Sequence, residues 1–369
     1  MKKNIFRISI LFVLLIFISS CSSSRPIKIG LVGNFTGPSS SNPEKGKRAV
    51  FLAIEEINKS GGINGRPIEL MIQDDFNDSK IAIKTAKNFI EDGIDIIIGH
   101  YTSTMTKSVF DIINKSKILY ISPVANSMLF SKQDDNFIMI NATSSSEAEA
   151  VYNTASDNGN KNLLLLFNSK NETYGNSLYT ALNDAFVKTD GNVQKQSFND
   201  YISIRFDETA DSIKQYDGIY IAGNGIDTAF IVKELKGIGY EKNIYLSAWS
   251  NGVDLYRLGG NYLDGAYIMT AVNSESQNPK YLAFQEKYTD LYGESPNSSA
   301  IYSYDTMMLI AENLRKIKKY SAKNLKAEIL NSKEFKGLET NCQINEFGDS
   351  TRVFYPMIIK DGVAISIND

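Results

Sequence analysis

Polar side chains follow two of the apolar runs that read as buried strands. The run "IDIIIG" is followed by His100-Tyr101-Thr102-Ser103, and Ser103 opens the helical stretch "TMTKSVFDIIN". Ligands of open α/β sheets bind beyond the carboxyl ends of strands, and a helix N-terminus offers unpaired N–H groups and a positive dipole end to an anion. We therefore expect this loop to hold an anionic group. The expected binding residues on this wall are Tyr101, Thr102, Ser103, Val124, Ala125 and Asn126.

Within this wall, Ser103 and the Asn126 side-chain amide are expected to hold the anion, and Val124 and Ala125 to offer backbone atoms. Ser103 also fits a plain helix N-cap, which stabilises a helix by roughly 1 kcal/mol, and it could serve both purposes. Asn126 fits a turn residue after Pro123 equally well.

Aromatic and amide residues in the second half of the chain make a second set of candidates. Tyr174 in "ETYG" and Trp249 in "LSAWS" lie at loop positions after predicted strands, where their rings could enclose an apolar ligand body. Asn224 in "AGNG" would add a polar contact near the hinge. The alternatives are a core aromatic for Trp249 and a turn residue for Asn224. Four more residues have a place beside the ligand only as the alternative. The sequence favours a loop role for Asn42, packing for Tyr302 and Tyr304, and a structural helix-start role for Asp305.

The sequence lacks the residues that most enzyme and metal sites require. The chain contains one histidine, which removes most His-based catalysis and multi-His metal sites. The glycines of "GLVGNFTG" do not follow G-x-G-x-x-G, and neither a Walker loop nor G-x-S-x-G occurs. We therefore expect no enzymatic activity, no cofactor and no metal. The net charge of −3 gives no support to nucleic-acid binding.

The elements that must position these residues alternate between strands and helices. Apolar runs such as "IKIGLV", "IELMIQDD", "IDIIIG" and "ILYIS" are separated by helical stretches, and the alternation resumes from "NLLLLF" to "AYIMTA". This pattern predicts an α/β protein with two doubly wound parallel-sheet lobes. Beyond Asn278 a helical block precedes a β-rich tail, so we expect the chain to cross back between the lobes.

The N-terminus has the features of an exported lipoprotein. Lys2, Lys3 and Arg7 precede an uncharged run over 8–18, as in a secretory signal, and Ile18-Ser19-Ser20-Cys21 resembles a lipobox. We expect a signal peptide over 1–20 and a lipidated tether over 21–26 attached through Cys21. The alternative is an ordinary signal in which Cys21 is incidental. With Cys21 lipidated, the protein would be extracytoplasmic and anchored on the periplasmic side or the outer cell surface. Cys342 would remain a free thiol.

Several segments together resemble the leucine/isoleucine/valine-binding family of extracytoplasmic solute receptors, which has the type I periplasmic-binding-protein fold. The most specific is "AIEEINKSGGINGRPIEL", with its Gly-Gly-Ile-Asn-Gly turn behind a helix. The remaining segments are "IKIGLVGNFTGP", "QDD", "IIIGHYTS", "ISPVANS", "TYGNSL", "AGN", "LSAW" and "FGDSTR".

This resemblance implies two lobes joined by three crossover strands, with 27–141 plus 271–338 in the N-terminal lobe and 142–270 plus 339–369 in the C-terminal lobe. It also implies capture of a small amino acid or related carboxylate-bearing solute by hinge closure. Delivery would be to a membrane ABC permease and its ATPase subunits, by a monomer.

The sequence departs from the family at two site positions. Asn126 falls where a small hydroxyl is usual, and Trp249 falls about where amino-acid-binding relatives supply a carboxylate for the ligand ammonium. Asp305 is a candidate for that missing partner. The departures leave a regulatory or sensory envelope lipoprotein of the same fold as the alternative function. An extracytoplasmic hydrolase is opposed by the missing histidines.

Overall fold

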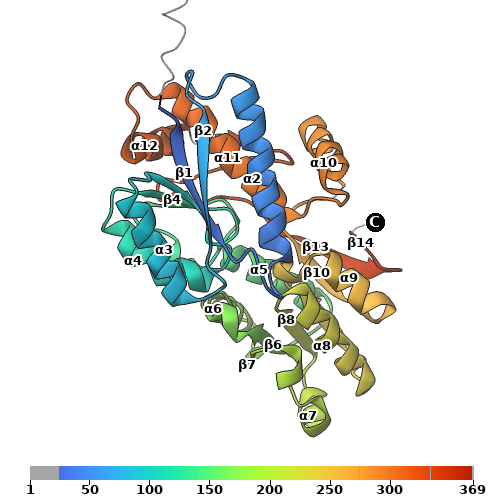
Figure 1. The fold of residues 1–369 in the computed structure, drawn as a ribbon. Helices are drawn as coiled ribbons and strands as arrows, with labels where there is room; N and C mark the ends of the chain where they lie inside the picture. The colour runs from blue at the N-terminus through green and yellow to red at the C-terminus, as the bar shows by residue number, and fades with distance from the viewer. Residues whose placement is uncertain (1–24, 274, 333, 368–369) are drawn as a thin grey trace, which may run out of the picture.

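A computed structural model describes residues 25–273, 275–332 and 334–367 (Figure 1). The expected signal peptide and the lipid-bearing Cys21 lie outside these residues. Within the described part of the chain, no helix has both the length and the apolar character needed to cross a bilayer.

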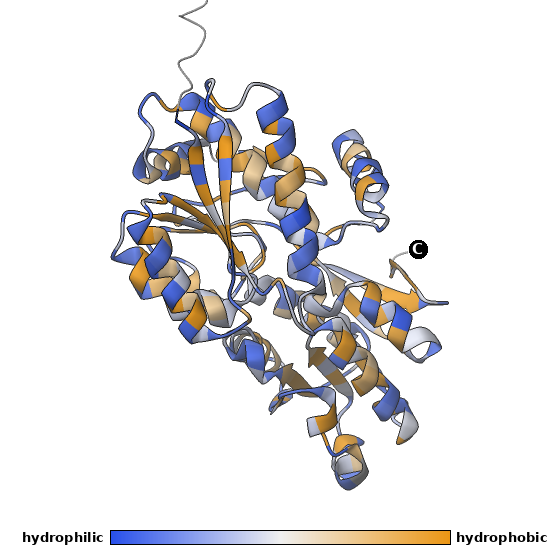
Figure 2. Ribbon diagram, viewed as in Figure 1, coloured by the Kyte–Doolittle hydropathy of each residue, from blue (hydrophilic) through white to orange (hydrophobic). Residues whose placement is uncertain are grey.

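The first lobe is built on a five-stranded parallel sheet with the strand order β2-β1-β3-β4-β5. Its central strands are apolar almost throughout because helices cover both faces (Figure 2). The strands are β1 (Ile27–Gly33), β2 (Ile68–Asp74), β3 (Ile96–Ile98), β4 (Leu119–Ser122) and β5 (Phe137–Met139). The helices between them are α2 (Ser41–Lys59), α3 (Ser79–Glu91) and α4 (Ser103–Asn114), with a short 3-10 turn η1 (Met128–Phe130).

The second lobe contains a seven-stranded sheet with the order β14-β13-β10-β9-β8-β6-β7. Strands β6 to β10 pair in parallel, whereas β13 pairs antiparallel with both β10 and β14. The strands are β6 (Asn162–Asn168), β7 (Asn192–Phe198), β8 (Gly218–Ala222), β9 (Asn243–Leu246), β10 (Tyr267–Thr270), β13 (Tyr355–Lys360) and β14 (Val363–Ser366). The helices are α5 (Ser144–Asp157), α6 (Glu172–Val187), α7 (Phe206–Ile213), α8 (Gly225–Gly237) and α9 (Val253–Gly259), with the 3-10 turns η2 (Ser169–Asn171), η3 (Tyr201–Ser203), η4 (Ala248–Ser250) and η5 (Gly260–Leu263).

The chain passes between the lobes three times: after β5, after β10 and before β13. After β10 it returns to the first lobe, where α11 packs along α2 (Figure 1). The elements of this return are α10 (Pro279–Tyr292), α11 (Ser298–Lys316), α12 (Ala322–Ser332), β11 (Glu334–Lys336) and β12 (Asn341–Gln343). This is the two-lobed type I fold, as expected from the sequence.

The third crossing lies later in the chain than the expected boundary at residue 339. The Met139 N–H donates to the Gly348 carbonyl, and the Ser350 N–H donates to the Met139 carbonyl. These bonds hold the segment beside β5 of the first lobe, because it continues that sheet edge by backbone pairing. The chain reaches the second lobe only after Ser350.

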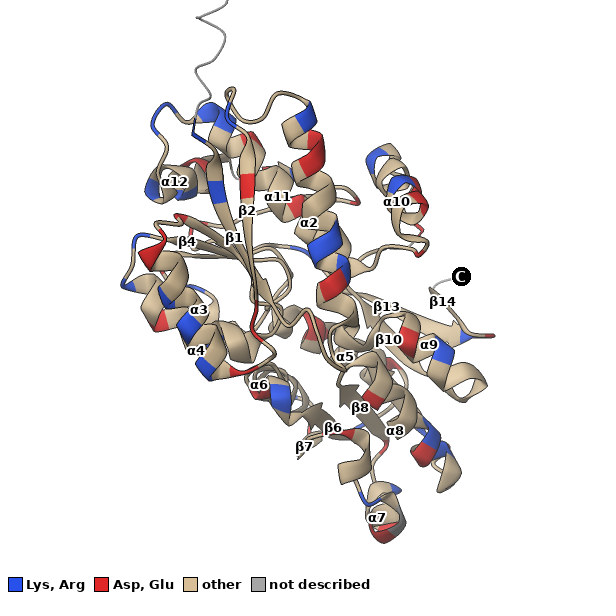
Figure 3. Cartoon of the chain, viewed as in Figure 1, with Lys and Arg blue, Asp and Glu red and all other residues tan. Residues whose placement is uncertain are grey.

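Charged residues of both signs alternate along the helices, for example along α2 and α10 (Figure 3). The interior between the helices and the sheets is apolar. The residues that follow β1, β3, β4 and β9 lie where the two lobes meet.

Candidate ligand-binding cleft

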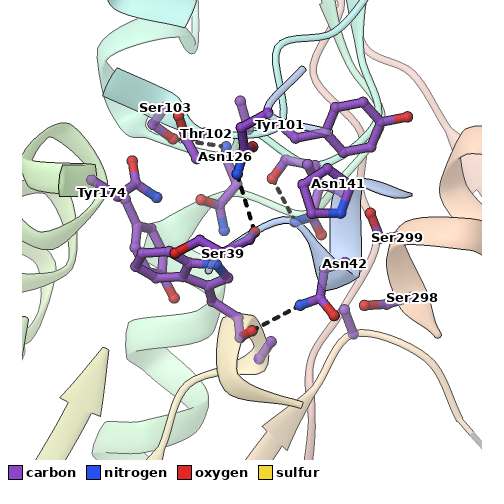
Figure 4. Close-up of a pocket in the computed structure, with 18 of the residues that line it drawn as sticks. Ser39, Asn42, Tyr101, Thr102, Ser103, Asn126, Asn141, Tyr174, Ser298 and Ser299 are labelled. Carbon is purple, nitrogen blue, oxygen red and sulfur yellow. Dashed lines mark hydrogen bonds between the residues drawn. The ribbon is translucent and has the colours of Figure 1, made fainter. Parts of the chain in front are cut away.

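A cleft of about 790 Å³, part of it open to solvent, lies between the lobes at the carboxyl ends of the strands (Figure 4). All six residues expected on the first-lobe wall line it, from Tyr101 to Ser103 and from Val124 to Asn126. Tyr174 and Trp249 line it from the second lobe. Sequence segments that are more than 140 residues apart thus meet around one space.

The N-terminus of α4 forms the centre of the first-lobe wall. Thr102 is the N-cap, and its hydroxyl accepts a hydrogen bond from the Met105 N–H at 3.4 Å. Ser103, which is 1% exposed, instead accepts a bond on Oγ from the Asn126 N–H at 3.3 Å. The N-cap alternative for Ser103 is therefore wrong, because Thr102 occupies that position.

Two backbone groups expected to contact a ligand are already used within the first lobe. The Ala125 N–H donates to Ser122 Oγ at 3.0 Å, and the Val124 carbonyl accepts from Asn141 Nδ2 at 3.0 Å. Both residues line the cleft, but these particular atoms hold the loop after β4 in shape. Val124 and Ala125 thus serve mainly as wall.

Tyr101 forms a rigid side of the cleft. Its hydroxyl bonds to Ser303 Oγ at 2.8 Å, and its ring meets Phe35 edge-on. A Cβ at Gly46 would lie 2.5 Å from the Tyr101 ring, so α2 can pass this close only with glycine there. Burial raises the pKa of Tyr101 above its usual range, and the phenol stays neutral.

Tyr174 and Trp249 pack against each other on the opposite wall. Their ring centroids are 6.2 Å apart at 83°, an edge-to-face contact. Trp249 is half-buried, and its carbonyl accepts a bond from Asn42 Nδ2 at 3.0 Å across the cleft. Asn42, which the sequence favoured as a loop residue, therefore borders the cleft and bridges the lobes.

Glu147 lies in the cleft and was missed by the sequence analysis. It is 1% exposed, and its carboxylate accepts from the Tyr174 hydroxyl at 2.8 Å, the Tyr220 hydroxyl at 3.1 Å and the Ala248 N–H at 2.9 Å. Burial raises the pKa of Glu147, although these donors act in the opposite direction. The run "SSSEAEA" shows only an ordinary helix start, so its sequence gave no signal of burial.

Two further polar atoms in the cleft have no partner among the described residues. Asn141 Oδ1 and Ser299 Oγ are buried and make no hydrogen bond, and both residues lie on the cleft wall (Figure 4). Buried polar groups are normally paired. A polar ligand group would satisfy them.

Three other candidates lie elsewhere. Asn224 caps α8 by accepting from the Asp227 N–H at 3.0 Å, and it borders a neighbouring recess instead of the main cleft. Asp305 forms a buried ion pair with Arg352 at 2.6 Å, so the idea that it pairs a ligand ammonium is wrong. Tyr304 bonds to Glu56 away from the cleft. In the part of the chain that the structure describes, no group of His, Cys, Asp and Glu is arranged to hold a metal.

The family model described as periplasmic binding protein matches residues 26–362. The chain belongs to the periplasmic binding protein family. Among its relatives in this family is a leucine-, isoleucine-, valine-, threonine- and alanine-binding protein of Pseudomonas aeruginosa, 25% identical over 362 residues that cover 95% of this chain and 94% of the relative.

Solved structures share the whole two-lobed architecture. A leucine-binding protein of Thermotoga maritima superposes with a TM-score of 0.82 at 21% identity, over 93% of this chain and 99% of that one. A solute-binding protein from R. palustris, solved with benzoate, gives a TM-score of 0.80 at 17% identity, over 93% and 95% of the two chains. At these identities the structural likeness supports the fold of this periplasmic binding protein. The class of ligand has to be inferred from the residues of its own cleft.

Proposed function

We propose that this protein is the extracytoplasmic substrate-binding lipoprotein of an ABC importer. It captures a small amino acid or a related carboxylate-bearing solute in the inter-lobe cleft by hinge closure. It catalyses no reaction; the solute passes to a membrane permease that is driven by its ATPase subunits.

The observation that carries the proposal is the chemistry of the two facing walls. Ser103 at the start of α4 offers a hydroxyl beside a helix N-terminus, which suits a carboxylate. Opposite, the Tyr174 and Trp249 rings offer apolar surface for the rest of the ligand. The names of the Pseudomonas and Thermotoga relatives point to the same class of solute.

The membrane attachment rests on the sequence. The basic residues, the apolar run and the Ile18-Ser19-Ser20-Cys21 pattern support export followed by lipidation of Cys21. A lipid at that cysteine would leave a short serine-rich tether before the fold, which begins with β1.

Native mass spectrometry of the purified protein, before and after unfolding and refolding, tests the proposal. A stoichiometric adduct that is lost on refolding would give the solute by mass. Thermal-shift assays with amino acids, short carboxylates and aromatic acids then test rebinding. No adduct and no shift with any compound would contradict the proposal.

The second candidate is a regulatory or sensory envelope lipoprotein that keeps the fold and signals to a protein partner. The departures at Asn126 and Trp249 favour it. Saturable binding of a small solute accompanied by lobe closure in small-angle scattering would count against this alternative.

A further inference from the structure

Glu147 is a buried carboxylate that has no cationic partner among the described residues. It is 1% exposed and lines the cleft, yet no ion pair involves it. The groups that bond to it are two tyrosine hydroxyls, a backbone N–H and the Asn126 side-chain amide, all of them neutral. Lys170 also lines the cleft, but from its exposed rim.

The neutral donors fix the position of this carboxylate without cancelling its charge. Oε1 accepts bonds from Tyr220 and Ala248, and Oε2 accepts one from Tyr174. The Asn126 side-chain amide also faces the carboxylate, so every donor around it is neutral and none cancels its charge. Burying an unpaired charge is costly, and a cation that enters the cleft would offset that cost.

Asn126 connects this carboxylate to the anion-binding end of the cleft. Its N–H donates to Ser103 Oγ at 3.3 Å, and its carbonyl accepts from the Ser144 N–H at the start of α5 at 2.7 Å. Its side-chain amide faces Glu147 and lowers the pKa of that carboxyl. The start of α4 and Glu147 are thus linked through a single residue.

We propose that Glu147 receives the ammonium group of the ligand and restricts the cleft to α-amino acids. In an α-amino acid the ammonium and carboxylate groups share one carbon, which matches a carboxylate at the start of α4 and an ammonium at Glu147, two positions bridged by Asn126. This inference rests on the proposed function and narrows its ligand class. The ammonium group is then bound by a residue of α5, and Trp249 contacts the side chain of the ligand.

Protonation of Glu147 would compete with an ammonium group. The titratable groups that face it are Tyr174 from α6 and Tyr220 from β8. Burial first, and the charge of Glu147 second, raise the pKa of both phenols well above the usual range, so they remain neutral. With Lys170 at the exposed rim, Glu147 is the buried group whose charge changes as the pH falls.

The test compares amino acids with counterparts that lack only the amino group. L-Alanine, L-valine, L-leucine and L-phenylalanine are paired with propionate, isovalerate, isocaproate and hydrocinnamate, and affinities are measured by calorimetry on the wild-type protein. We expect at least one amino acid to bind more tightly than its partner. Glu147→Gln should weaken that amino acid by about 30-fold or more, the usual cost of losing one partner of a buried charge pair, and leave the desamino acid nearly unchanged.

Glu149→Gln is the matched control, because Glu149 is exposed on the same helix and loses the same charge. It should bind every ligand like the wild type. Equal loss in both variants, or an unchanged amino-acid affinity in Glu147→Gln, would overturn the role of Glu147 while the proposed function stands. The role of Glu147 would also be overturned if the wild-type protein bound the desamino acids as tightly as the amino acids. Binding of neither class would contradict the proposed function itself.

A second variant covers the case in which Glu147→Gln does not fold. Tyr220→Phe removes one donor to the carboxylate without touching the cleft lining, which raises the pKa of Glu147 further. Its preference for the amino acid over the desamino partner should fall as the pH is lowered, and the fall should begin at a higher pH than in the wild type. A preference that is independent of pH in both proteins would contradict the inference.

Discussion

Two neighbouring hydroxyls at the start of α4 have different positions: Thr102 caps the helix, and Ser103 lines the cleft. Because Thr102 caps the helix, Ser103 Oγ can face the cleft, and its hydrogen-bond partner in the described part of the chain is the Asn126 N–H. Ser103→Ala should weaken ligand binding by about 1 to 3 kcal/mol, through loss of a charge-assisted hydrogen bond. Titration calorimetry measures the change, and urea unfolding should show an intact fold. Ser108→Ala on the same helix, outside the cleft, is the control; unchanged affinity in Ser103→Ala would limit Ser103 to holding Asn126.

The Trp249 ring should set how much apolar ligand surface the cleft can cover. Trp249→Ala removes that surface, while the carbonyl that Asn42 contacts remains in place. We expect a loss of about 2 kcal/mol or more for leucine or phenylalanine and a smaller loss for alanine. Tyr262→Ala, at an exposed position of the second lobe, is the control. A loss of the same size for every ligand would mean that the indole is structural.

At the residue scale, the sequence predicts those cleft-lining residues that directly follow a buried strand. Ser103, Asn126 and Trp249 were found because each follows a buried strand whose carboxyl end lies at the cleft between the two sheets. Glu147 and Asn141 were not found, because their burial depends on partners from distant segments that no local pattern records. Asn224 follows a strand as well, but its amide is used to cap α8.

At the element scale, the turn before β5 contains a carboxyl group, that of Asp135, whose ionised form is disfavoured by burial. Burial raises the pKa of Asp135 to about 6, and its Oδ2 atom has no hydrogen-bond partner among the described residues. A raised folded-state pKa means that the native protein binds the proton more tightly than the unfolded chain does. The stability attributable to this group is therefore lost as the pH rises from about 4 to 6.

Asp135→Asn should remove that loss. We expect the variant to be more stable than the wild type by about 1 kcal/mol above pH 6, a value discounted for the partial exposure of Asp135, and nearly equal near pH 4. Urea unfolding at both pH values measures this difference. Asp134→Asn, next to it and 95% exposed, is the control. A wild-type advantage above pH 6 would show that the Asp135 carboxylate is stabilising.

The elements themselves were largely predictable, because hydrophobic runs separated by helical stretches specify parallel sheets. Strands β1 to β4, β6 and β8 to β10 lie where the apolar runs place them, whereas the mostly polar β7 was not predicted. The segment before β13 was harder to place, because it joins β5 through backbone bonds of Gly348 and Ser350. Such bonds are independent of side-chain type, so the sequence pattern does not reveal them.

At the scale of the whole molecule, hydrogen bonds connect the lobes around the cleft. Asn42 Nδ2 bonds to the Trp249 carbonyl at 3.0 Å, Asn77 Nδ2 bonds to the Lys170 carbonyl at 3.4 Å, and the Thr104 N–H donates to Asn171 Oδ1 at 3.2 Å. Each bond requires the lobes to be close together. In a hinged protein, such bonds stabilise the closed state whichever ligand is bound.

Asn42 is suited to test this coupling, because its amide contacts the opposite lobe and its Oδ1 accepts from Asn297 within its own lobe. Asn42→Ala should weaken every ligand by the same factor, about 0.5 to 1.5 kcal/mol for one hydrogen bond. The apparent affinity of every ligand depends on the same population of the closed state, so a change in that population weakens all ligands equally. The loss in Trp249→Ala, by contrast, should depend on the size of the ligand. Fluorescence of the single tryptophan and small-angle scattering would report affinity and closure together. Asn88→Ala on the exposed face of α3 should change neither; a loss in Asn42→Ala that depends on ligand size would instead assign Asn42 to the ligand.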